Sequence, residues 1–203
     1  MYGKVGRQIA ADGSINPLRT DRDGNLVVSA YGGKYSDLVA AGRVFSAANQ
    51  AAVATTAALA TTWTGLGICN PTTSTQDLVL LEFGAAHSVA VPAAGAVGLM
   101  HADATGFAAD ITPVNACRGH SNTSVAIADA GATIGTPVLL RVYGQGGTVA
   151  TTEYGLQPGL TVDLNGSVVL SPGQSILTYT TLACTAAYLF HFVWAELDRA
   201  SDS

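Results

Sequence analysis

The stretch "AAYLFHFVWAEL" (residues 186–197) is the densest apolar and aromatic run in this 203-residue chain, and its conformation decides the fold. A membrane anchor, an active-site segment around His191 and the last strand of a β-domain are the three alternatives. No segment of the chain approaches the roughly 18 uninterrupted apolar residues that a membrane-spanning helix needs. We therefore interpret residues 186–197 as a β-strand.

In a strand, successive side chains point to opposite faces of the sheet. Both faces of this strand are apolar, whereas a strand with one side in water alternates apolar with polar residues. We therefore expect the second face to be covered too, by the N-terminal arm or by another copy of the chain, and His191 to be a hydrogen-bonded structural residue. One face holds Tyr188, Phe190, Phe192 and Trp194, the other Leu189, His191, Val193 and Ala195, and the candidate residues for the core or a subunit interface are Tyr188, Leu189, Phe190, His191, Phe192, Val193 and Trp194.

Upstream of this strand, the chain carries several further strand patterns separated by turn signals. Strands are expected at 77–91 and 95–103, and at 136–144, where Val138, Leu140 and Val142 alternate with Leu139, Arg141 and Tyr143. Asn165-Gly166 predicts a hairpin, and Pro172-Gly173 predicts a turn. The Ala- and Thr-rich stretch before Trp63 is expected to be irregular or extended. Short strands without a long amphipathic helix predict an all-β sandwich or barrel.

The composition points to a subunit of an assembly. Charged residues make up 11% of the chain, against roughly 25% in a typical soluble protein. A net charge of −5 argues against a general nucleic-acid-binding protein, which would present a basic face. The three cysteines, Cys69, Cys117 and Cys184, are far apart and form no C-x-x-C pair, so we expect free thiols rather than a zinc or redox site.

Residues 1–42 differ from the rest of the chain in charge and in turn signals. Most of the basic residues lie in or next to this segment, and "DRDGN" (residues 21–25) predicts a tight turn leading into a short strand. We predict an extended N-terminal arm with a short hairpin over 1–42, a β-sandwich over 43–199 and a disordered tail over 200–203. The first residues lack the apolar region of a signal peptide, and we expect synthesis in a cytoplasm.

No catalytic constellation was identified in the sequence. The four histidines have no metal-ligand spacing, and neither a G-x-S-x-G elbow nor a phosphate-binding glycine loop is present. We therefore expect no enzyme activity, cofactor or metal. The alternative function is glycan binding by the β-sandwich, with the 101–124 loops binding sugar through His101, Asp103, Phe107, Arg118 and His120.

The order of four segments resembles a family of tailed-bacteriophage virion proteins of the capsid decoration, or cement, type. These segments are "RDGNLVVSAYGGKYSDLVAAGRVFSA" (22–47), "LVLLEF" (78–83), "VVLSPGQSI" (168–176) and "AAYLFHFVWAELD" (186–198). The resemblance implies a jelly-roll-like β-sandwich that forms a homotrimer on the outside of the capsid. It assigns Asp23–Val28 to the arm, Ser171–Ser175 to the last turn and Trp194–Glu196 to the closing strand.

We accordingly expect a structural virion protein, located on the capsid surface, that stabilises the shell without catalysis. In the glycan-binding alternative, the chain would be a module of a phage head fibre or tail that serves host attachment. Its partners would be other copies of itself and the major capsid protein, with no nucleic acid and no membrane. The arm would reach across the junctions between capsomers. Its candidate contacts to the capsid are Arg7, Arg19, Arg22, Asp23 and Asn25.

Overall fold

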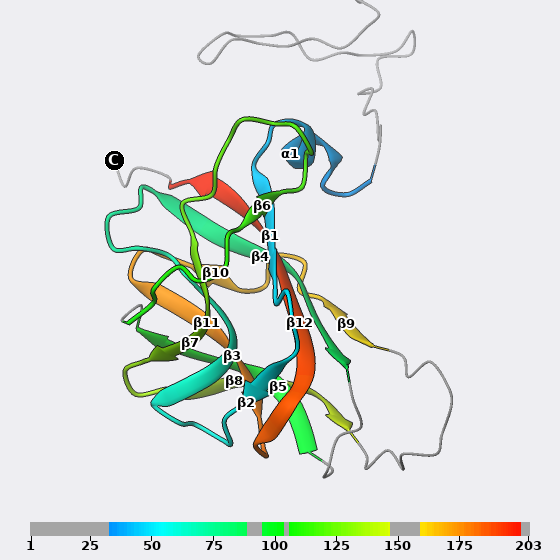
Figure 1. Ribbon diagram of the computed structural model, residues 1–203. Helices are drawn as coiled ribbons and strands as arrows, with labels where there is room; N and C mark the ends of the chain where they lie inside the picture. Colours follow the sequence, from blue (N-terminus) through cyan, green and yellow to red (C-terminus); the bar gives the residue numbers. More distant parts are fainter. Residues whose placement is uncertain (1–32, 89–94, 104–105, 147–158, 200–203) are drawn as a thin grey trace, which may run out of the picture. The chain divides into compact units, whose positions relative to one another are not determined.

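The computed structural model describes residues 33–88, 95–103, 106–146 and 159–199. Over these ranges the chain forms one short helix and twelve strands (Figure 1). Residues 1–32 of the predicted arm (1–42) and the predicted tail (200–203) lie outside the described residues. The elements are α1 (Ser36–Ala40), β1 (Val44–Ala48), β2 (Val53–Thr55), β3 (Thr62–Cys69), β4 (Gln76–His87), β5 (Gly95–Asp103), β6 (Val114–Asn115), β7 (Ile127–Thr133), β8 (Val138–Gly146), β9 (Leu160–Asp163), β10 (Val169–Leu170), β11 (Gln174–Thr180) and β12 (Cys184–Asp198).

The strands form two antiparallel sheets that pack face to face, which confirms the predicted all-β sandwich. In the described part of the chain, the larger sheet has the order β10–β4–β12–β1–β6, with β2 also paired to β12 and β9 to β4. The smaller sheet has the order β7–β3–β11–β5–β8. The two four-strand rows β1–β12–β4–β9 and β3–β11–β5–β8 have the order of a jelly roll, and β6 and β7 are insertions between β5 and β8.

The inner side of β12 forms the centre of the core, as the alternation of residues 186–197 predicted. Tyr188, Phe190, Phe192 and Trp194 are at most 3% exposed. Their rings pack in a row against Phe83 of β4, with Phe83 and Phe192 centroids 5.2 Å apart, and against Phe45 of β1, 6.4 Å from Trp194. Burial of each of these side chains stabilises the fold by roughly 2 kcal/mol or more. The smaller sheet completes the core with Leu66, Ile68, Val97, Leu99, Ala128 and Ile176.

A second, smaller core covers part of the other side of the five-stranded sheet. It contains Trp63, Met100, Ala102, Ile134 and Leu177, with Phe107 packed against them. The loop that carries Phe107 is held by the buried carboxylate of Asp129, which accepts a 2.6 Å hydrogen bond from the Ala108 amide. Trp63 donates its indole N–H to the Thr178 carbonyl at 2.8 Å. Both faces of this sheet are therefore partly buried within a single chain.

The Ala- and Thr-rich stretch holds more regular structure than its composition predicted. It contains β1 and β2, and β3 begins at its end and is buried along most of its length. Sequence patterns missed β3 because Thr and Gly interrupt its apolar residues. Gly65 has a positive φ of 154°, and a side chain there would collide with the Thr178 hydroxyl, so this glycine is required by the close approach of β11.

The Asn165-Gly166 signal marks a turn, as predicted, but the predicted hairpin is wrong. Both residues have positive φ, yet β9 and β10 on either side do not pair with each other. Instead, both pair with β4 and run in the same direction along it, so residues 164–168 form an excursion within one interrupted strand. The Pro172-Gly173 turn is confirmed, with Gly173 at a φ of 88° and a hydrogen bond from the Gln174 amide to the Ser171 carbonyl.

The simple alternation predicted for β8 is also wrong. The pairing of β8 with β5 shifts twice, so that Leu139 lies opposite Met100 while Arg141 lies opposite Leu99. An extra residue in one strand changes which side chains share a face. As a result Val138, Leu139, Leu140 and Val142 are all exposed.

The first shift depends on Gly98, and this makes a testable prediction. A Cβ at this position would lie 2.2 Å from the Arg141 carbonyl oxygen, a backbone atom that cannot rotate away. We expect Gly98→Ala to lower the free energy of unfolding by about 2 kcal/mol, measured by urea denaturation. Gly131→Ala in β7 is the matched control, since its Cβ would meet nothing nearer than 3.4 Å. Equal stability of the two variants would contradict the described register.

Candidate functional site

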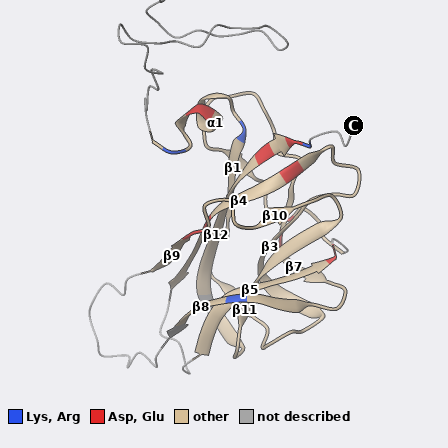
Figure 2. Ribbon diagram, turned by 180° about the vertical axis from the view of Figure 1, so that it is seen from behind, with Lys and Arg blue, Asp and Glu red and all other residues tan. Residues whose placement is uncertain are grey.

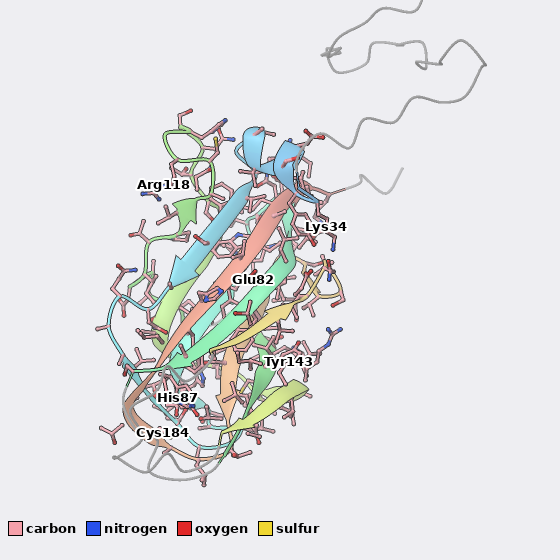
Figure 3. All side chains as sticks on the ribbon, turned by 90° about the vertical axis from the view of Figure 1, so that its right-hand side faces the viewer. Lys34, Glu82, His87, Arg118, Tyr143 and Cys184 are labelled. Atoms are coloured by element: carbon pink, nitrogen blue, oxygen red, sulfur yellow. The ribbon has the colours of Figure 1, made fainter. Side chains whose placement is uncertain are left out.

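The outward side of β12 is the candidate interaction surface. Here we call it the β12 face, formed by Leu189, His191 and Val193 with their neighbours Ser46 and Ala48 on β1 and Gly84 and Ala86 on β4. Leu189 is 36% exposed, and Val193 is partly exposed. Figure 3 looks onto this sheet, with Glu82 near the middle of it. The seven predicted residues thus divide by parity, with the aromatic ones in the core and the other three on this surface.

His191 and Glu82 form the polar centre of the β12 face. His191 Nε2 lies 2.8 Å from Glu82 Oε1, and both side chains are about 40% exposed, at 39% and 42%. The imidazole lies directly over Gly84, where any Cβ would overlap it, so the glycine provides the space for this pair. His191 is therefore a hydrogen-bonded residue, as predicted. This hydrogen bond pairs one polar atom of each side chain, and the side chains around them on the β12 face are mainly apolar.

A shallow hollow adjoins His191 on the β12 face. Its volume is about 210 Å³, and Leu189, Ala86 and Leu160 supply much of its apolar lining. The floor is fixed by buried Asn49, whose amide donates to the Gly65 carbonyl and whose oxygen accepts from the Phe190 amide, both at 3.2 Å. The hollow thus has mainly apolar walls, with polar groups of His191, Asn49 and Thr161 in its lining.

The prediction that the second face of β12 is covered holds at one end within the described chain. Ala195 and its neighbour Val44 are at most 2% exposed, and α1 lies at this end of the sheet (Figure 3). From Leu189 to Val193 the face stays partly open to solvent. The arm residues Arg7, Arg19, Arg22, Asp23 and Asn25 lie outside the described residues.

Glu196 is a structural residue whose role the sequence did not reveal. Its carboxylate is 3% exposed and accepts hydrogen bonds from the Val125 amide at 3.1 Å, from the Ser124 hydroxyl and from the Trp194 indole at 3.2 Å. The "WAE" motif thus joins the last strand to a loop 70 residues earlier. Only the i, i+2 spacing of Trp194 and Glu196, which places both on the inner face, could have signalled this.

The residues of the alternative glycan site are not gathered in one place. Asp103 ends β5 in the smaller sheet, and Phe107 packs into the second core. His120 lies against Gly42, just before β1 in the larger sheet, and Figure 3 shows Arg118 near the same end. His101, Asp103 and Phe107 thus lie on or beside the smaller sheet, and His120 lies near the start of β1 in the larger sheet.

Charge is sparse on the described surface (Figure 2). Two ion pairs, Arg43 with Asp198 at 2.8 Å and Arg199 with Asp77 at 3.5 Å, join neighbouring strands of the larger sheet. A hydrogen bond from Gln76, together with Arg43, holds the pKa of the Asp198 carboxyl below its usual range. Over the described ranges, no group of three potential metal ligands is found, and no helix is long and apolar enough to cross a membrane.

The cysteines are free thiols, as predicted. Cys69 and Cys184 are buried, and Cys117 is partly exposed. Burial raises the pKa of the Cys69 thiol to about 11. At neutral pH this thiol is protonated and acts as a small apolar side chain of the core.

The Glu196 anchor predicts a large loss of stability on truncation. Glu196→Ala would leave the buried Trp194 indole and the partly buried donors of Val125 and Ser124 without this acceptor, and we expect the free energy of unfolding to fall by about 2–4 kcal/mol. Asp198→Ala is the control on the same strand, because its carboxylate is solvent-exposed and its loss should change stability little. Urea denaturation of both variants checks this, and a Glu196→Ala protein as stable as Asp198→Ala would refute the anchor.

His87 predicts a pH dependence of stability. Burial lowers the pKa of His87 below its ordinary value, as its ring packs 4.6 Å from that of Tyr188. The unfolded chain then binds the proton more readily, so the stabilising contribution is complete above pH about 6.5 and is lost as the pH falls below it. We expect the melting temperature to decrease more between pH about 7.5 and about 5.5 in the wild type than in His87→Gln. Parallel pH curves would contradict this burial effect.

Three comparisons with known proteins identified no relative of this chain. A scan against models of protein families, a search of curated protein sequences and a search of solved structures each found no match to the chain.

Proposed function

We propose that this chain is a non-enzymatic structural protein of a tailed-bacteriophage virion, a capsid decoration protein that binds the outside of the major capsid shell as a homotrimer and stabilises it. The observation that carries the proposal is the β12 face. The sheet presents Leu189 and Val193 to solvent at the middle of the molecule's longest strand, where a strand facing water would carry polar side chains. Such a surface is typical of a subunit contact.

The low charge of the chain supports the same proposal. A protein with 11% charged residues has few groups that keep it apart from other copies of itself. Two of the motifs that resemble cement proteins lie in strands of the larger sheet. "LVLLEF" is part of β4, and "YLFHFVWAELD" is part of β12. Jelly-roll sandwiches are used in viral capsids but also in lectins and cupins, so the fold alone supports the proposal only weakly.

The proposed mechanism is burial of surface repeated over many sites. Each trimer would contribute a modest free energy of binding to the shell, because much of the gain from apolar burial is offset by the entropy lost on association. A trimer that contacts several capsid subunits at once gains avidity. Decoration would thereby raise the barrier to rupture of a shell that contains packaged DNA.

Reconstitution tests this function directly. The purified chain is mixed with DNA-filled capsids that lack it, and binding is followed by sedimentation and by cryo-electron microscopy. We expect density for three copies on the outside of the shell and a higher temperature of DNA release. Decorated and bare capsids that release DNA at the same temperature, or an absence of bound density, would contradict the proposal.

Leu189→Lys places a charge on the β12 face. In the same experiment, we expect this variant to leave capsids bare. Leu59→Lys is the matched control, since Leu59 is a leucine of similar exposure, 43% against 36%, in the turn between β2 and β3. We expect Leu59→Lys to decorate capsids like the wild type.

A further inference from the structure

The second exposed apolar surface of the described chain lies on β8, at the edge of the smaller sheet. We call it the β8 patch, formed by Val138, Leu139, Leu140 and Val142, each at least 40% exposed. In the described part of the chain, β8 pairs with β5 alone, so its other edge has no strand partner. Exposed apolar edge strands are normally protected in soluble proteins, which makes this patch a candidate contact.

We propose that the β8 patch of one copy of this chain docks on the β12 face of the next copy, with a leucine of β8 in the hollow beside Leu189. Size and chemistry support this pairing. The hollow measures about 210 Å³ and has apolar walls of Leu189, Ala86 and Leu160. Since an apolar cavity of roughly 150 Å³ can hold a benzene molecule, this hollow has room for a leucine side chain.

Charge complementarity favours a second copy as the occupant. Arg141 lies between Leu140 and Val142 in β8 and donates to the Ser167 hydroxyl at 2.9 Å, and it has no carboxylate partner among the described residues. Two carboxylates lie beside the hollow, because Glu82 of β4 is directly opposite Asp163 of β9. Neither of them is paired with a lysine or arginine in the described chain. A β8 patch placed on the β12 face would bring Arg141 to the carboxylates of Asp163 and Glu82, the latter already hydrogen-bonded to His191.

The symmetry of the contact follows from its two different surfaces. The β8 patch belongs to the smaller sheet and the β12 face to the larger one, so the contact is heterologous. Each copy has one β8 patch and one β12 face, and it can therefore bind two neighbours. A heterologous contact closes into a ring when the rotation between copies fits. This inference rests on the proposed homotrimer, for which it supplies the interface.

Two single variants test the pairing. Leu140→Lys disables the β8 patch and Leu189→Lys disables the β12 face, and light scattering after size-exclusion chromatography gives the mass of each. We expect three-chain particles for the wild type and for the control Leu59→Lys, and single chains for both variants. Circular dichroism and thermal unfolding confirm that the variants are folded.

Mixing the two variants provides the decisive result. In a heterologous contact, the intact β8 patch of Leu189→Lys can still bind the intact β12 face of Leu140→Lys, so the mixture should form a two-chain particle with one copy of each. A mixture that stays single-chain, or a Leu140→Lys protein that remains a trimer, would overturn the pairing.

The capsid experiment separates this inference from the proposed function. Wild-type protein that decorates capsids as a trimer while Leu140→Lys does the same would refute the β8 contact but support the function. Wild-type protein that is single-chain and leaves capsids bare would refute both.

Discussion

The packing of aromatic rings along the inner side of β12 is the constraint on which the rest of this structure depends. Phe190, Phe192 and Trp194 occupy the centre of the core, and β1, β2 and β4 pair with the strand that carries them. Because the inner side chains must stay in register with Phe83 and Phe45, the outward side chains of the same strand are fixed too. The packing of these rings thus determines which side chains of β12 face the core and which face outward.

The aromatic alternation of residues 186–197 predicted which side chains of β12 lie in the core, and the short strand patterns upstream predicted the all-β fold. The hydrogen bond between His191 and Glu82 confirms the prediction that His191 is a hydrogen-bonded residue. The jelly-roll order came from a resemblance rather than from the residues, and the strand pairings agree with it. Local patterns work here because burial on one face and extended geometry reinforce each other.

What the sequence did not reveal depends on contacts between distant segments. The partners of Glu196 lie near residue 125, and no local signal connects them. The excursion at Asn165 and the shifts in β8 arise from pairing with β4 and β5, so a turn signal predicted the bend but not the strands around it. The hollow beside Leu189 likewise needs β1, β4, β9 and β12 together.

The central claim is that the outward side of β12 becomes buried when copies of the chain assemble. Hydroxyl-radical footprinting of the wild-type protein, below and above the concentration at which it assembles, measures this directly. The account predicts that Leu189 and Val193 are oxidised in single chains and protected in the assembled particle, while Leu59 is oxidised equally in both. Equal oxidation of Leu189 in the single chain and in the assembly would contradict it.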